Sequence, residues 1–180
     1  MIKHKKILLG VCGGIAAYKS AYIIRLLIKS GAEVKVIQTP DSKNFIAPLT
    51  FATLSKNPVF CESHNPETGE WYSHIELAEW SDAMLIAPAT ANTMSKMVAG
   101  MADNLLLTTY LSAVCPIVIA PAMDLNMYKH PATVQNMEIL KKRGHQIIAA
   151  QEGELASGLC GEGRMAEPED IVVFLNKIFK

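Results

Sequence analysis

Several features are scarce in this chain of 180 residues, and each absence excludes a class of protein. Its four cysteines stand far apart, and no Cys or His pair has zinc-site spacing, so a disulfide-rich secreted scaffold and a zinc module are excluded. Free thiols fit a reducing compartment, so we expect a cytoplasmic protein. No stretch of about 18 or more consecutive apolar residues occurs, so we expect no membrane span.

Net charge is also absent. Lys plus Arg number 17 and Asp plus Glu number 17, so no overall field favours nucleic acid or an anionic membrane. Half of the residues are hydrophobic and 19% are charged, which excludes intrinsic disorder. We expect one domain over residues 1–180, with some apolar surface covered by partner subunits.

The N-terminus resembles a secretory signal peptide, since the basic MIKHKK precedes the apolar ILLGVCGGIAA. Gly10, Gly13 and Gly14 interrupt that apolar run. A buried strand that leads into a glycine turn accounts for the same letters, and we favour that interpretation.

Strand-length apolar runs alternate with helix-like segments along the chain. We expect strands at Lys6–Cys12, Glu33–Gln38, Asp82–Ala87, Pro116–Ala120 and His145–Ala149. We expect helices at Gly14–Lys29, from Asp41 or Ser42 to about Leu54, in IELAEWS, and at Thr90–Val98, Asp103–Ala113, Pro131–Arg143 and Glu167–Phe179. This alternation predicts a doubly wound α/β fold of the Rossmann or flavodoxin type, with a parallel sheet covered by helices on both faces. Ligands in such folds bind at the carboxyl ends of the strands.

Two stretches, Asn57–Trp71 and Glu152–Pro168, follow no clear period. Loops of this length inside a compact domain are often functional. We therefore expect function in both of them.

The loop after the first expected strand contains Gly13 and Gly14 at a helix N-terminus, where free backbone amides suit an anion. The spacing is not that of G-x-G-x-x-G, and no acidic residue follows Gln38 to hold a ribose. Thr39 and Ser42 offer hydroxyls to a phosphate. The pattern favours a mononucleotide over NAD, and the alternative is a glycine turn that binds nothing.

The loop after Ala87 brings together Pro88, Thr90, Asn92 and Thr93. Small polar side chains beside backbone amides suit an uncharged planar ring such as an isoalloxazine. The alternative is a plain helix cap by Thr90 or Asn92 with no ligand.

The loop after Ala120 places Met123, Met127 and Tyr128 around Asp124 and Asn126. Methionine adapts to irregular apolar contacts, so this segment is either a substrate lip or part of the core.

His74 precedes the short helical segment IELAEWS, where the helix dipole favours the neutral imidazole that a general base requires. Arg164 lies in a loop with three glycines and suits a carboxylate or a phosphate. The alternatives are a structural histidine and a surface ion pair of Arg164 with Glu162 or Glu167.

Taken together and in order, six stretches resemble the homo-oligomeric flavin-containing cysteine decarboxylases, and the resemblance runs from about Lys5 to Pro168. These stretches are GGIAAYKS, TPDSKNFI, HIELAEW, APATANTMSKMVAGMADNLL, PAMDLNMY and SGLCGEGRMAEP. They are most similar to the branch that acts on phosphopantothenoylcysteine in coenzyme A biosynthesis, often as the N-terminal part of a bifunctional decarboxylase/synthetase.

The resemblance implies FMN as cofactor, a trimer or a dodecamer built from trimers, and a flavin near a subunit interface. The implied chemistry is oxidation of the substrate's cysteinyl group to a thioaldehyde, loss of CO₂ to an enethiolate, and return of the electrons to give 4′-phosphopantetheine. The implied base is His74. The implied flavin contacts are Gly13, Gly14, Ile15, Thr39, Ser42, Thr90, Ala91, Asn92, Thr93 and Ala122. The implied substrate contacts are Asp124, Met127, Ala156, Ser157, Arg164 and Met165.

Two positions depart from the family pattern. Asp124 stands where the family usually has an asparagine that holds the departing carboxylate, so the carboxyl is protonated, turned away, or destabilising to the bound substrate. Ser157 stands where the family usually has a reducing cysteine. We expect Cys160, three residues later, to supply the thiol as proton donor, because a serine hydroxyl is a far weaker acid; the alternative is an incidental loop cysteine.

The second departure keeps two other functions open. Peptidyl-cysteine decarboxylases of lantibiotic biosynthesis lack the reducing cysteine and stop at the enethiol. A non-catalytic flavin-binding regulatory subunit is the other alternative. The intact GRM segment at Gly163, Arg164 and Met165 favours the coenzyme A branch.

Overall fold

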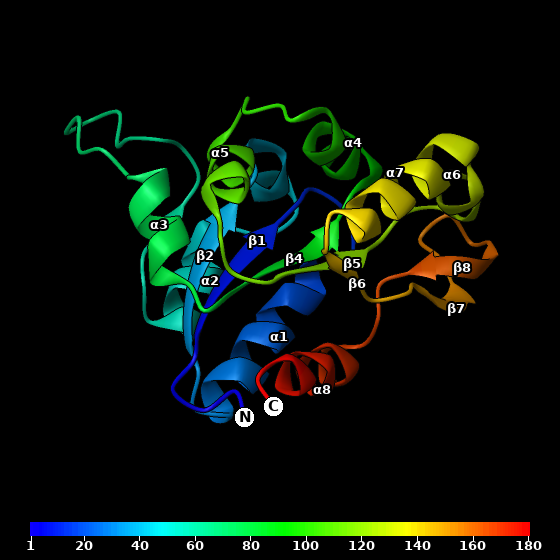
Figure 1. Ribbon diagram of the computed structural model, residues 1–180, viewed down its shortest axis with the longest axis horizontal. Coiled ribbons are helices and arrows are strands. Elements are labelled where there is room, and N and C mark those ends of the chain that lie inside the picture. The colour runs from blue at the N-terminus through cyan, green and yellow to red at the C-terminus, as the bar shows by residue number, and fades with distance from the viewer.

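A computed structural model describes all residues, 1–180, and its centre is a six-stranded parallel sheet (Figure 1). The strands run in the order β3-β2-β1-β4-β5-β6, and every neighbouring pair is parallel. They are β1 (Lys6–Val11), β2 (Glu33–Gln38), β3 (Val59–Phe60), β4 (Ala83–Ala89), β5 (Ile117–Pro121) and β6 (Gln146–Ile147). The predicted doubly wound fold is confirmed, and so is the interpretation of the N-terminal apolar run as a buried strand.

Helices cover both faces of the sheet (Figure 1). One face carries α1 (Ala17–Lys29), α2 (Pro48–Ser55) and α8 (Pro168–Ile178). The other carries α3 (His74–Trp80), α4 (Ala91–Ala99), α5 (Leu105–Ser112) and α7 (Pro131–Lys142). None of these helices is long and apolar enough to span a membrane.

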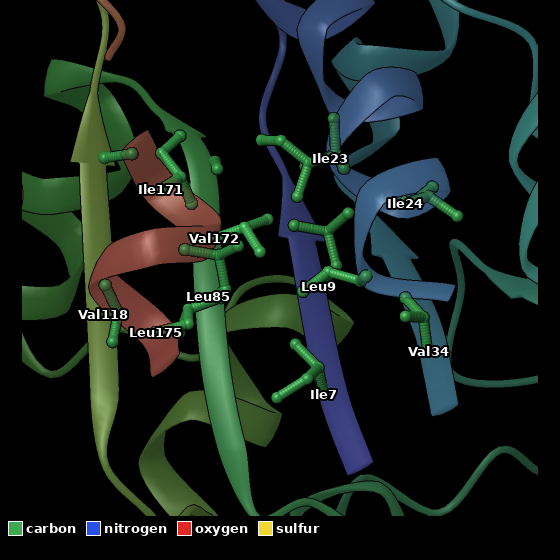
Figure 2. Close-up of a cluster of buried hydrophobic side chains, with 14 of the residues drawn as sticks. Ile7, Leu9, Ile23, Ile24, Val34, Leu85, Val118, Ile171, Val172 and Leu175 are labelled. Atoms are coloured by element: carbon green, nitrogen blue, oxygen red, sulfur yellow. The ribbon is translucent and has the colours of Figure 1, made fainter. Parts of the chain in front are cut away.

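Alternation along the strands divides the core into two clusters. Ile7 and Leu9 of β1 face α1 and α8, whereas Leu8 between them faces the opposite set of helices. Figure 2 shows the first cluster, where side chains of β1, β2, β4 and β5 meet those of α1 and α8. Because both faces are covered, the strands read as continuous apolar runs, which made them recognisable in the sequence.

One expected helix is divided in two. The segment from Asp41 to Leu54 forms a 3₁₀ helix, η1 (Pro40–Asn44), followed by α2 from Pro48. Ala47 between them is extended, with φ −65° and ψ 140°. A proline disfavours the helical conformation of the residue before it, so Pro48 ends one helix and begins the next.

The aperiodic stretch 152–168 contains an antiparallel hairpin of β7 (Gln151–Glu154) and β8 (Cys160–Arg164), a two-stranded sheet of its own. It lies beside the short helix α6 (Leu125–Lys129) (Figure 1). The Met123 amide donates to the Gly163 carbonyl at 3.0 Å, and a Cβ on Gly161 would lie 2.7 Å from Leu125 Cδ1. A Cβ on Gly163 would collide with the Met123 carbonyl oxygen, so glycine is required where β8 meets the segment before α6.

The other aperiodic stretch, 57–71, contains the two-residue strand β3 and one isolated bridge between His64 and Trp71. It leads to α3, on the opposite side of the molecule from the hairpin in Figure 1. The expectation of function in an aperiodic stretch is thus best met by 152–168, which lines a cavity.

We predict that Leu85→Ala lowers the free energy of unfolding by about 3 kcal/mol, because it leaves a cavity in the central strand β4. Leu85 is fully buried in the first cluster. Urea unfolding at fixed protein concentration measures the change. Val173→Ala on α8 is the control, since Val173 is 54% exposed and should cost less than about 0.5 kcal/mol. Equal losses in the two variants would contradict the prediction.

Candidate functional site

The site lies where the strand order reverses. β1 and β4 are neighbours, yet the chain leaves β1 for α1 on one face and leaves β4 for α4 on the other. Doubly wound folds open a crevice at this switch point. Two cavities lie there, of about 560 Å³ and about 510 Å³. They adjoin, because Gly14, Thr90, Ala122 and Met123 line both.

The smaller, which we name the loop cavity, is formed by the ends of β1, β2 and β4 and by the start of α4. Its lining residues are Gly13, Gly14, Thr39, Pro40, Asp41, Thr90, Ala91, Asn92, Thr93, Lys96, Asp103, Asn104, Ala122, Met123 and Met127. Lys96 is its only cation and pairs with Asp103.

Four backbone amides at the start of α1, those of residues 13–16, donate no hydrogen bond within the chain. Ala16, the N-cap of α1, has no side chain that could satisfy them. Free amides at a helix N-terminus, with the helix dipole behind them, favour an anionic group. Gly13 lies directly against the Asp41 carboxylate, so a larger residue at position 13 would have to displace that side chain.

The start of α4 is capped by its own side chains. The Thr93 amide donates to Thr90 Oγ1 at 3.2 Å, and the two hydroxyls lie 3.2 Å apart. Cys12 lies beneath them. The pKa of its thiol is raised overall, because the effect of burial exceeds the opposing effect of hydrogen bonds with Thr93 and Thr90. The site therefore has a neutral thiol and two hydroxyls at this point, which suits an uncharged ring.

The larger, which we name the hairpin cavity, lies between α1, the loop after β5 and the β7–β8 hairpin. Its lining residues are Gly14, Ile15, Ala16, Tyr18, Lys19, Pro88, Thr90, Ala122, Met123, Asp124, Glu154, Leu155, Ala156, Ser157, Gly163 and Arg164.

Two cations of the hairpin cavity share one carboxylate. Lys19 is 4% exposed, and its Nζ donates to the Met165 carbonyl at 2.9 Å and to Glu167 Oε1 at 3.0 Å. Arg164 Nη2 donates to the same oxygen of Glu167 at 2.8 Å. The expected alternative of an ion pair between Arg164 and Glu167 is therefore present, and Arg164 still lines the cavity.

The two residues that depart from the family pattern are in contact. Ser157 Oγ donates to Asp124 Oδ2 at 2.6 Å. The Asn126 amide donates to Asp124 Oδ1 at 3.2 Å, which makes Asp124 the N-cap of α6. Asp124 is therefore turned toward the chain itself.

Most of the expected flavin contacts converge on the loop cavity: Gly13, Gly14, Thr39, Thr90, Ala91, Asn92, Thr93 and Ala122. Ile15 lines the hairpin cavity instead. Ser42 lines neither cavity, since it is fully buried and its hydroxyl donates to the Thr39 carbonyl at 2.8 Å. Its hydroxyl holds the loop rather than facing a ligand.

The expected substrate contacts divide in a similar way. Asp124, Ala156, Ser157 and Arg164 line the hairpin cavity, and Met127 lines the loop cavity. Met165 is 1% exposed and belongs to the core beside α8.

The two expected catalytic residues lie outside both cavities of their own chain. His74 is the first residue of α3, after the N-cap Ser73. Cys160 is exposed on β8. Since Gly161 and Gly163 face the segment 123–125, strand alternation directs Cys160 to the other face of the hairpin.

Sequence reasoning missed Lys19, Asp41, Lys96 and Asp103 as lining residues. All four lie inside stretches already singled out, so their place beside the expected ligand loops was an available signal. The ion pair of Lys96 with Asp103 is formed by the fold, and no spacing in the sequence marks it.

Free helix amides at the switch point of a doubly wound sheet define a nucleotide-binding class of protein. A family model described as Flavoprotein matches residues 1–180, and the chain belongs to that family.

Two curated relatives and two solved structures are similar over most of the chain. The coenzyme A biosynthesis bifunctional protein CoaBC of Bacillus subtilis (strain 168) is 43% identical over 179 residues, covering 99% of this chain and 44% of the relative. A cysteine/cysteine sulfinic acid decarboxylase of an unknown prokaryotic organism is 65% identical over 127 residues, covering 71% and 35%. The chain thus spans less than half the length of these relatives.

The first structure is a PPC decarboxylase mutant complexed with pantothenoylaminoethenethiol. It is 31% identical, with a TM-score of 0.85, and the match covers 98% of this chain and 99% of that one. MrsD from Bacillus sp. HIL-Y85/54728 is 28% identical, with a TM-score of 0.87, and the match covers 99% and 98%.

Proposed function

We propose that this chain is an FMN-dependent carboxy-lyase that converts 4′-phosphopantothenoylcysteine to 4′-phosphopantetheine in coenzyme A biosynthesis. The observation that carries the proposal is the adjacency of the two cavities, which share four lining residues. A ring held in the loop cavity would face a substrate held in the hairpin cavity. The likeness to CoaBC and to the PPC decarboxylase structure supports this substrate.

The residues of the loop cavity fit FMN better than a dinucleotide. Free amides at residues 13–16 suit a single phosphate, and the hydroxyls of Thr90 and Thr93 suit the edge of a flat ring. β2 ends in Gln38, which is buried and whose Nε2 donates to the Ile46 carbonyl at 3.0 Å, so the end of this strand does not supply the acid that holds a ribose in dinucleotide sites. When bound, FMN supplies a reversible two-electron oxidation.

In the hairpin cavity, Arg164 and Lys19 are positioned for the anionic groups of the substrate. Glu167 offsets part of their charge and fixes both side chains. Arg164 keeps further N–H donors and is part of the hairpin, so it would bind ligand as the hairpin covers the cavity.

His74 would act as the base across a subunit contact. It lies outside both cavities of its own chain, between Trp71 and Ile75, which are 61% and 51% exposed. At the hairpin cavity, Ile15 and Tyr18 are 62% and 50% exposed. These apolar side chains fit a homo-oligomer, either a trimer or a dodecamer built from trimers, in which the α3 of one copy reaches the hairpin cavity of another.

Cys160 would donate the final proton only from a neighbouring subunit or after movement of the hairpin, because it lines neither cavity of its own chain. This position is a second reason to expect an oligomer.

Decarboxylation of free cysteine is a second candidate. The relative named cysteine/cysteine sulfinic acid decarboxylase is 65% identical over 127 residues. Free cysteine carries an ammonium group where the larger substrate has an amide, and Asp124 places a carboxylate at the wall of the cavity. A third candidate is the purely oxidative peptidyl-cysteine decarboxylase, which is favoured by Ser157 in place of the family's cysteine.

We predict that the purified protein is yellow and contains FMN. Heat release followed by chromatography against standards identifies the cofactor. FAD or NAD, or no chromophore after reconstitution with FMN, would contradict the assignment.

We predict that His74→Asn abolishes CO₂ release and leaves FMN bound, because α3 lies away from the loop cavity. CO₂ release and the flavin spectrum are measured on the same preparation. His130→Asn is the control, since His130 caps α7. Turnover above about a tenth of the unmutated rate, a barrier change below about 1.4 kcal/mol, would show that His74 is not the base.

We predict that phosphopantothenoylcysteine yields the saturated thiol, identified by mass spectrometry. Accumulated enethiol would favour the purely oxidative function, turnover of cysteine alone the second candidate, and no reaction a regulatory subunit. Cys160→Ala should accumulate enethiol if Cys160 is the donor. A normal yield of saturated thiol from that variant would place the donor elsewhere.

A further inference from the structure

We propose that Asp124 and Ser157 form one positioning unit that holds the turn of the β7–β8 hairpin closed over the hairpin cavity. Ser157 lies in the hairpin turn, and Asp124 lies in the loop between β5 and α6. The two residues are 33 positions apart and both line the cavity. Their hydrogen bond therefore joins the two walls of the hairpin cavity.

The bond has the geometry of a strong contact. Its length, 2.6 Å between Ser157 Oγ and Asp124 Oδ2, is typical of a hydroxyl that donates to a carboxylate. The other carboxylate oxygen accepts from the Asn126 amide. With both oxygens engaged, the carboxylate is fixed against α6, and the hydroxyl takes its orientation from the carboxylate.

The remaining contacts of the turn are internal to it. The Leu155 amide donates to the Leu159 carbonyl at 2.8 Å, and the Gly158 amide donates to the Leu155 carbonyl at 2.9 Å. The base of the hairpin is held separately, by the Met123 amide and the Gly163 carbonyl. Ser157 makes the one side-chain hydrogen bond that connects the tip of the hairpin to the body of the protein.

This arrangement assigns Asp124 an indirect role toward the substrate. An ionised carboxylate has no hydrogen to donate to a substrate carboxylate, and each oxygen of Asp124 already accepts one hydrogen bond from the chain. Asp124 therefore acts through the position of the hairpin. Ser157 likewise acts by holding Asp124, so neither residue touches the reacting atoms.

Hydrogen–deuterium exchange of the FMN-containing protein tests the pair without substrate. We expect Ser157→Ala, Asp124→Ala and the double variant each to speed exchange of amides in the segment 155–159 about tenfold. The double variant should exchange no faster than either single one, since all three lose the same bond. Ser157→Thr should retain protection. Ser112→Ala, on α5, is the matched control and should leave the segment unchanged.

Asp124→Asn keeps an acceptor for Ser157 and for the α6 cap, so it serves if Asp124→Ala fails to fold. We expect the exchange rate of the segment 155–159 in Asp124→Asn to lie between the rates of the unmutated protein and of Ser157→Ala. Unchanged exchange in Ser157→Ala, or additive effects in the double variant, would overturn the proposal.

The kinetic test rests on the proposed decarboxylase function. Ser157→Ala should raise KM for phosphopantothenoylcysteine about tenfold and leave kcat within about twofold, because a less ordered hairpin costs binding rather than chemistry. A fall in kcat with accumulated enethiol would show that Ser157 acts on the reacting atoms, which overturns the positioning role. If no variant and no unmutated protein decarboxylates, the proposed function fails, and the exchange data alone decide the pair.

Discussion

Because β1 pairs with β2 on one side and with β4 on the other, the chain must leave its two central strands toward opposite faces of the sheet. This divergence opens the crevice that both cavities share. The glycine turn before α1 lines this crevice, and its free amides have no side-chain cap. The rest of the site is arranged around this crevice. Thr90 and Thr93 at the start of α4 line the loop cavity, and the β7–β8 hairpin forms the outer wall of the hairpin cavity.

The hairpin is held by backbone and glycine rather than by apolar packing. Gly161 and Gly163 leave no side chain between β8 and the segment 123–125, so the strand lies directly against it. Such contacts bury little apolar surface, and the hairpin is therefore easier to open than the sheet. A wall of this kind suits a substrate that must enter, be covered and leave again.

The central sheet could be predicted because β1, β2, β4 and β5 are buried on both faces and therefore have continuous apolar sequences. The hairpin could not, because QEGE and CGEGR carry neither alternation nor β-branched residues, and its strands exist through contacts distant in sequence. The same limit applies to Ser42. The sequence alone suggests that its hydroxyl is available to a phosphate, whereas in the fold this hydroxyl donates to the Thr39 carbonyl. The motifs predicted that the glycine turn, the threonines of α4 and Arg164 lie at the site, and all of them line a cavity. The motifs could not predict that His74 and Cys160 lie outside the cavities of their own chain, because that depends on how α3 and the hairpin are placed in the fold.

The two departures from the family pattern illustrate what sequence spacing hides. Considered singly, an aspartate in place of an amide introduces a charge beside a substrate carboxylate, and a serine in place of a cysteine removes an acidic proton. In the structure Ser157 Oγ lies 2.6 Å from Asp124 Oδ2, so the serine hydroxyl donates a hydrogen bond to the carboxylate. Without its acceptor, the serine would leave the hairpin tip with no side-chain hydrogen bond to the body of the protein. Each departure is therefore compensated by the other, and the pair is best regarded as one change at a single contact.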